Sequence, residues 1–352
     1  MAAVFPNLRP ESYQPHWLHG SDRNWQETNC YVDVWIEVLS AIGYEPCAAM
    51  GFTVTQDFEG DQFTFFKYPP EDLDLLYHIS VQELAIYDRV EAHAIAQIER
   101  GRLPLVEVDS YYLPDTDGVS YKIEHTKSTV GLNRIDIDGR SAEYFHNCGF
   151  YYVTGDDFDR LFRRAPRVPR NESADDDTLF PYVEFVKFGR APAVETLPQL
   201  AIERLLYHIA RRPEHNPLRE FAGALESDLE ALLERDNADF HKYAFNTARQ
   251  FGANFDLLAA HLDWIAQQGG PRATGAIEAS QSIAAVAKVL QFQMARAVAR
   301  KRAKGLKEGV TPIADAYDAA FEDLERHFGR VEHGRFGNAV VPAVRGLQEV
   351  CR

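Results

Sequence analysis

The chain has 352 residues, of which 45% are hydrophobic and 26% charged, and this length allows two soluble domains of ordinary size. Its formal net charge of −16 disfavours a large nucleic-acid interface, which needs clustered Lys and Arg side chains. No run approaches the ~18–20 consecutive apolar residues of a membrane span, and the first residues lack the pattern of a secretory signal, so we expect a cytoplasmic protein.

The first half of the chain mixes helix and strand patterns. An apolar-periodic stretch from Cys30 predicts a helix that ends near Gly43 and Pro46. Further along, the pattern predicts a strand over 63–68 and helices over 72–79 and 83–100. Strands are then expected at 105–109, 127–135, 141–145 and 150–153, and residues 182–188 are expected to return to this domain as a strand. These elements indicate an α+β domain.

From about residue 197 onward the pattern is helical alone. Asn216-Pro217 and Thr311-Pro312 are typical helix starts. A Pro-rich, charged stretch at 164–177 is a candidate linker or exposed loop. Helices are expected over 203–211, 216–236, 240–251, 255–268, 277–305 and 311–328. The expected organisation is an α+β domain over 1–190, a helical bundle over 191–330 and a tail over 331–352.

The candidate chemistry begins at Cys30, which stands at the start of the first helix. The free N–H groups of a helix N-terminus favour a thiolate over a thiol. His125 and Asn147 follow along the chain, and Cys, His, Asn is the order of a papain-like nucleophilic site. His125 would be the proton partner, and the amide oxygen of Asn147 would orient it.

Other interpretations of these residues stay open. A cysteine among Trp25, Tyr31 and Trp35 is more often an inert buried residue, and His125 is as readily a structural histidine. Cys148, beside His146 and Asn147, is a rival nucleophile without a helix terminus.

Two further positions are candidates for binding the substrate. Gln26, with the backbone N–H of Cys30, is the candidate oxyanion hole, and Asn29 competes with it. Asp109, at the end of its strand, is a candidate for binding a substrate ammonium group, although a solvated or turn-capping aspartate fits the sequence equally well.

One local cluster of basic residues interrupts the acidic chain. Arg296, Arg300, Lys301 and Arg302 lie near the end of a predicted helix, where they would form either a docking patch for an acidic partner or a solvated helix face. We expect no metal, because the sequence contains no HExxH motif and no CxxC pair.

Several segments resemble a known family. Cys30 with its helix, the segment Leu105-Val-Glu-Val-Asp-Ser-Tyr-Tyr-Leu-Pro114, residues 124–129 and Tyr144-Phe-His-Asn147 resemble a bacterial family catalogued as domain of unknown function 1839. That resemblance includes 240–245 and 288–300. More distantly, about residues 20–160 are similar to the N-terminal domain family of butirosin biosynthesis protein H, acyltransferases of papain-like, bacteriocin-processing-peptidase-like fold.

The distant resemblance implies a papain-like domain in which Cys30 is the nucleophile and His125 the base, whereas Asn147 stands where those relatives usually carry an aspartate. It implies transfer of an aminoacyl group from a carrier-protein thioester to an amine, with no cofactor other than the carrier's phosphopantetheine. The alternatives are a cysteine amidohydrolase or peptidase on the same scaffold, and a catalytically silent module that binds a carrier protein.

Overall fold

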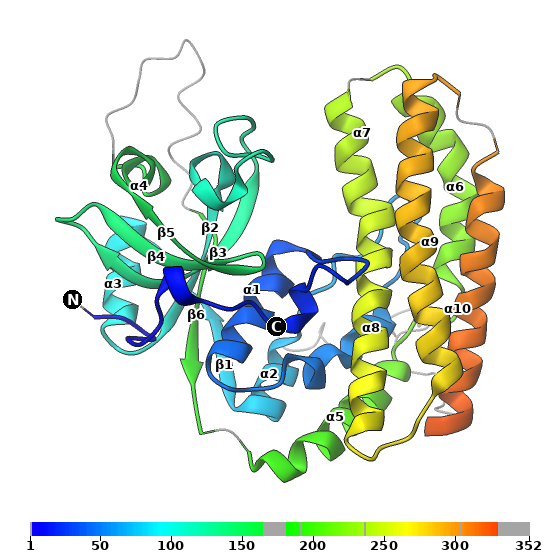
Figure 1. Cartoon of the computed structure of the whole chain (residues 1–352), viewed down its shortest axis with the longest axis horizontal. Helices are drawn as coiled ribbons and strands as arrows, with labels where there is room; N and C mark the ends of the chain where they lie inside the picture. The colour runs from blue at the N-terminus through cyan, green and yellow to red at the C-terminus, as the bar shows by residue number, and fades with distance from the viewer. Residues whose placement is uncertain (1, 165–180, 191, 236, 303–304, 330–352) are drawn as a thin grey trace, which may run out of the picture.

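The computed structural model describes residues 2–164, 181–190, 192–235, 237–302 and 305–329. Two regions stand side by side, a sheet with its covering helices and a set of long helices (Figure 1). The expected linker, apart from Arg164, and the expected tail lie outside the described residues. No helix among the described residues is long and apolar enough to cross a membrane.

The sheet has six strands in the order β1-β6-β2-β3-β4-β5, and every neighbouring pair is antiparallel. β6 returns from far along the chain to lie between β1 and β2; the sequence had predicted for residues 182–188 a strand that returns to this domain. The strands are β1 (Ile79–Glu83), β2 (Leu103–Asp109), β3 (Lys127–Asp136), β4 (Ser141–His146), β5 (Gly149–Thr154) and β6 (Val183–Phe188).

Helices cover both faces of the sheet. α1 (Cys30–Ala41) packs on one face, where Gly131 of β3 allows close approach because a Cβ there would stand 3.4 Å from Val34. The other face carries an apolar core that includes Ala94 of α3 (Val90–Ile98) and Phe158 of α4 (Gly155–Leu161). Alternate residues of β3 therefore face different cores.

The helical region is built from long helices that follow β6. These are α5 (Leu197–Ile209), α6 (Pro217–Leu232), α7 (Asn237–Ala244), α8 (Gln250–Gln267), α9 (Thr274–Ala299) and α10 (Lys307–Phe328). A π-helical turn, η8 (Phe245–Arg249), joins α7 to α8. A long buried 3-10 segment, η3 (Pro46–Thr55), lies against α5 and α8, and one apolar core runs from α1 through η3 into these helices.

Three local expectations were wrong. Only Phe63 of the expected strand 63–68 is bridged, to Phe58. The expected helix over 83–100 begins only at Val90, and the end of β1 occupies its first residue. The last helix begins at Lys307 rather than at Thr311 and contains Pro312. Buried Val310, one turn before buried Ile313, extends the apolar stripe across that proline, so packing outweighs the local signal for a helix start at Thr311.

The remaining short segments complete the path of the chain. They are α2 (Pro70–Tyr77) and the 3-10 turns η1 (Pro10–Ser12), η2 (Trp17–His19), η4 (Ser110–Tyr112), η5 (Pro114–Thr116) and η7 (Val194–Thr196). The N-terminal segment carrying η1 packs against β5, the edge strand of the sheet.

Candidate functional site

α1 begins at Cys30 because Asn29 caps it. The side-chain oxygen of Asn29 accepts from the N–H of Val32 at 3.0 Å, and its amide donates to the carbonyl of Phe66 at 3.1 Å. No acceptor among the described residues takes the backbone N–H of Cys30. Cys30 is half-buried, so its sulfur and its own N–H stand together at the helix start.

Among the described residues, the sulfur of Cys30 has a hydroxyl as its hydrogen-bond partner. Thr129 of β3 has its Oγ1 3.8 Å from the Sγ of Cys30. Thr129 lies on the face of the sheet that α1 covers, and its partner across β2 is Glu107. The thiol of Cys30 therefore contacts the sheet at Thr129 of β3, which pairs with Glu107 of β2.

His125 lies just beyond this same end of the β2–β3 pair, two residues before Lys127, which pairs with Asp109. Its Nδ1 is 2.6 Å from the Oδ2 of Asp109, and its ring stacks on Tyr111 with centroids 4.2 Å apart. The described contacts of His125 do not include Cys30. His125 precedes Thr129 by four residues along the chain, and no described contact joins its imidazole to the sulfur.

Asp109 therefore holds the imidazole of His125, the role that the sequence suggested for Asn147. It also accepts from the N–H of Tyr111 at 3.1 Å, so its carboxylate caps the turn after β2 as well. This arrangement leaves Nε2 of His125 as the ring nitrogen that faces no described acceptor, and the side chain is half exposed. An imidazole held through Nδ1 by a carboxylate is suited to take a proton at Nε2.

Asn147 lies in the tight turn between β4 and β5, with a φ of +42°. The following residue, Cys148, has its Sγ 3.8 Å from the Oε1 of Glu27, so this turn lies beside the segment that leads to Cys30. Burial, and then the negative charge of Glu27, raises the pKa of Cys148 to about 11, and burial raises the pKa of Cys47 well above its usual value. Neither thiol is suited to form a thiolate near neutral pH.

The other predicted positions are on the surface. Gln26 is exposed, four residues before Cys30. Arg296 lies in the last turn of α9, Arg300 caps that helix, and Lys301 and Arg302 follow it; all four are exposed and have no ion pair among the described residues. The same helix exposes Phe292 by 68% and Val289 by 53%. An apolar patch therefore adjoins the basic cluster.

Sequence reasoning missed a buried chain of hydrogen bonds on the opposite face of the sheet. Ser128 Oγ is 2.6 Å from Nε2 of His146, and Nδ1 of His146 is 2.5 Å from the carboxylate of Asp115. Asp115 also accepts from the hydroxyl of Tyr144 at 2.5 Å. Hydroxyl, imidazole and carboxylate follow the order of a serine triad. Ser128 is only 7% exposed, however, so the chain of bonds ties β3, β4 and η5 together inside the protein. Only the neighbouring Asn147 had been singled out by sequence.

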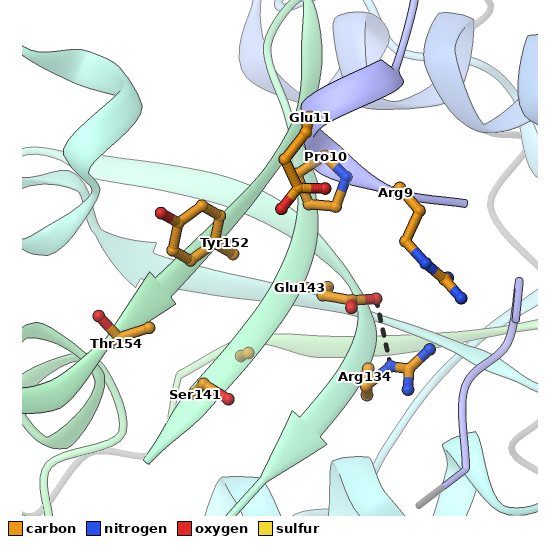
Figure 2. A pocket seen from close by; sticks show the side chains of 9 residues that line it. Arg9, Pro10, Glu11, Arg134, Ser141, Glu143, Tyr152 and Thr154 are labelled. Carbon is orange, nitrogen blue, oxygen red and sulfur yellow. Dashed lines mark ion pairs between the residues drawn. The ribbon is translucent and has the colours of Figure 1, made fainter. Parts of the chain in front are cut away.

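Two clefts lie along β5 and the N-terminal segment. The larger cleft has a volume of about 600 Å³ and is lined by residues that include Asp115, Tyr121 and Tyr151. The smaller cleft, of about 250 Å³, contains the ion pair between Arg134 and Glu143. Figure 2 shows this pair below Pro10 and Glu11. Neither cleft contains Cys30 or His125. In the described part of the chain, no group of three His, Cys, Asp or Glu side chains is arranged to hold a metal ion.

A buried charged cluster supports the start of α1. The ring of His19 bonds to the carboxylates of Glu37 and Asp33. Asp33 in turn accepts from the backbone N–H of Thr28 at 2.9 Å and from its hydroxyl at 2.6 Å. Burial acts to lower the pKa of His19, but the hydrogen bonds and charges of Asp33 and Glu37 outweigh it and raise the pKa to about 9. A protonated His19 therefore lies between two carboxylates at neutral pH.

Comparison with known proteins places the whole described chain in one family. The DUF1839 N-terminal domain model matches residues 14–188, and the DUF1839 C-terminal domain model matches residues 194–326. The boundary between the two matches falls just after β6, where the sheet ends and the long helices begin. A search of curated proteins finds no match.

Proposed function

Because the chain belongs to the DUF1839 family, and because that membership brings no activity with it, we propose a function from the site: Cys30 takes an acyl or aminoacyl group from a carrier-protein thioester and passes it to an amine. The observation that carries this proposal is the partly buried Cys30 at the first residue of α1, whose own N–H is taken by no described acceptor. A nucleophile next to a free backbone donor is the minimum that acyl transfer requires.

In the first step, the sulfur of Cys30 attacks the thioester carbonyl. The carbonyl oxygen takes the negative charge and accepts from the N–H of Cys30, with the amide of Gln26 as the second donor. The carbon–sulfur bond of the donor then breaks, and the leaving pantetheine sulfur takes up the proton that Cys30 lost, so pantetheine departs as a thiol. One thioester replaces another, so the step is close to thermoneutral.

In the second step, an amine attacks the acyl-Cys30 carbonyl. Because the imidazole of His125 makes no described contact with the sulfur, we assign it to this step, as the base for the acceptor amine. Nε2 of His125 takes the proton of the attacking amine, and Asp109 stabilises the imidazolium through Nδ1. The Cys30 sulfur leaves as a thiolate, and the imidazolium of His125 returns the proton to it, which regenerates the Cys30 thiol and the neutral imidazole.

The papain-like arrangement is part of the same proposal. Its support is that α1 packs on β3, β4 and β5 with Cys30 at the end nearest Thr129. Two residues compete for the role of third catalytic member. Asp109 bonds to His125, whereas Asn147 has the expected order in the chain and lies in the turn whose Cys148 contacts Glu27.

The test is direct. The full chain is incubated with an acyl-pantetheine thioester, and mass spectrometry is used to look for an acyl adduct on Cys30. Cys30→Ala should abolish the adduct, whereas the matched control Cys148→Ala should retain it. Adding small amines should release the amide, and His125→Ala should slow this release more than it slows adduct formation. Release of free acid only, whatever amine is offered, would instead indicate the hydrolase.

A specific observation favours one alternative, a silent carrier-binding module. The side chain beside the sulfur is Thr129, which cannot act as a base near neutral pH. In that case no adduct forms, and iodoacetamide labels Cys30 as slowly as it labels Cys148. The two functions therefore differ in a single mass spectrum.

We propose that the carrier protein docks on the exposed surface of α9. A carrier protein with an acidic helix would contact Phe292 and Val289 through apolar side chains. Its carboxylates would meet the neighbouring basic residues, which form no ion pair with any described residue. The triple variant R300E/K301E/R302E should raise KM for the carrier-bound thioester, most strongly at low salt, and leave the rate with free acyl-pantetheine unchanged. An unchanged KM would exclude this docking site.

A further inference from the structure

Residues 23–28 lead into Cys30, and the helical region holds this segment at several points. Figure 1 shows the dark-blue N-terminal chain reaching across to α8. Gly252 of α8 makes room for Trp25, because a Cβ there would stand 2.6 Å from the indole ring. The indole N–H of Trp25 donates to the carbonyl of Ala284 at 3.0 Å. Lys288 donates to the carbonyl of Asn24 at 2.5 Å, and Arg23 forms an ion pair with Asp256 at 3.0 Å.

Arg249 makes the contact nearest the thiol. Its Nε donates to the carbonyl of Thr28 at 3.2 Å, and its Nη2 donates to the carbonyl of Glu27 at 3.1 Å. The same guanidinium is 3.6 Å from the carboxylate of Glu27. One planar, permanently charged group thus binds two consecutive peptide carbonyls immediately before Asn29 and Cys30.

Thr28 is held from its other side as well. Its N–H and its hydroxyl both donate to Asp33 on α1, while its carbonyl accepts from Arg249. Since each peptide unit is planar, bonds to the carbonyls of Glu27 and Thr28 fix two successive peptide planes. Only Asn29, itself bonded through its side chain, lies between them and the N–H of Cys30.

Arg249 occupies an unusual place on its own helix. It is the last residue of the π turn η8, which inserts an extra residue into the helical path between α7 and α8. The guanidinium also lies 5.0 Å from the ring centroid of Phe245, at the start of the same turn. The π turn thereby changes the direction in which Arg249 projects relative to a regular helix, and π turns are frequent at functional sites.

We propose that Arg249 is a positioning residue for Cys30, through which the helical region completes the acyl-transfer site. It orients the sulfur and the backbone N–H of Cys30 by holding the two preceding carbonyls. This inference rests on the proposed function for the identity of the reacting group, and the placement of the segment by Arg249 is tested separately below. Arg249 itself does not touch the substrate in this account.

The test compares two reactions of Cys30 in Arg249→Ala, Arg249→Lys and the matched control Arg219→Ala, whose arginine pairs with Asp315 and Asp318 within the helical region. Acylation by acyl-pantetheine develops an oxyanion that needs the oriented N–H; alkylation by iodoacetamide does not. We expect Arg249→Ala to slow acylation about tenfold or more and alkylation less than about threefold. Arg249→Lys, which lacks the two-pronged donor, should lie between, and Arg219→Ala should match the wild type.

An unchanged ratio of acylation to alkylation in Arg249→Ala would overturn the positioning role. Hydrogen exchange of the peptide spanning 23–31 supplies the second measurement and needs no acyl chemistry. Faster exchange there in Arg249→Ala or Arg249→Lys, but not in Arg219→Ala, supports the role; unchanged exchange refutes it. If wild-type Cys30 forms no adduct, the proposed function fails, and the exchange experiment alone decides whether Arg249 orders this segment.

Discussion

The buried cluster of His19, Asp33 and Glu37 makes the stability of the protein depend on pH in a calculable way. The pKa of His19 rises from 6.5, its ordinary value, to about 9 in the folded chain, because two buried carboxylates bind its ring against the opposing effect of burial. The protonated form is therefore favoured in the folded state. Its contribution is fully present below pH ~6.5 and is lost as the pH rises through about 9.

The magnitude follows from the size of that change. Raising a pKa from about 6.5 to about 9 is worth about 3 kcal/mol, since each tenfold change in proton affinity corresponds to about 1.4 kcal/mol. This is a large fraction of the ~5–15 kcal/mol by which folded proteins are typically stable. Much of this free energy would stabilise the start of α1, because Asp33 also accepts hydrogen bonds from the N–H and the hydroxyl of Thr28.

The assay is urea unfolding of the full chain at several pH values between 6.5 and 9.5. The reference is the double variant His19→Gln, Glu37→Gln, which removes one buried positive and one buried negative charge and leaves Asp33 with its two donors from Thr28. The wild type should lose about 3 kcal/mol more than this variant across the range. Parallel curves for the two proteins would refute the assignment of a charged His19.

Three further outcomes are expected. Asn29→Ala should destabilise the protein by about 1–3 kcal/mol in urea unfolding, because the helix cap and a buried hydrogen bond are both lost; a change below about 0.5 kcal/mol would contradict this. Gly252→Ala should lower the stability by about 1–3 kcal/mol, since the added methyl group meets the ring of Trp25, and an unchanged Tm would show that the helices move apart freely. Asp109→Ala should slow amine release about as much as His125→Ala, and the double variant should be no slower than either single variant; additive losses would mean that the two residues do not act as a unit.

The sequence alone determined the features that depend on local physics. The apolar-periodic stretch from Cys30 predicted the start of α1, and the structure begins that helix at Cys30. Alternating strands separated by a turn predicted β3 and β4, because hairpin partners are close in the chain. The helical character of the second half followed from its apolar spacing over many turns.

The tertiary structure alone decided which distant residues meet. β1 was missed because its neighbour in the sheet, β6, lies about a hundred residues away and no local pattern records that pairing. His125 was expected beside Cys30, yet the register of β2 with β3 sets Asp109 against Lys127 and leaves the imidazole bonded to Asp109. The hydrogen bonds from Arg249 to the carbonyls of Glu27 and Thr28 join residues more than two hundred positions apart, and Arg249 donates them from the end of a π turn. Such contacts arise only once helices and sheet pack together, because side-chain direction over long separations is set by packing and not by sequence spacing.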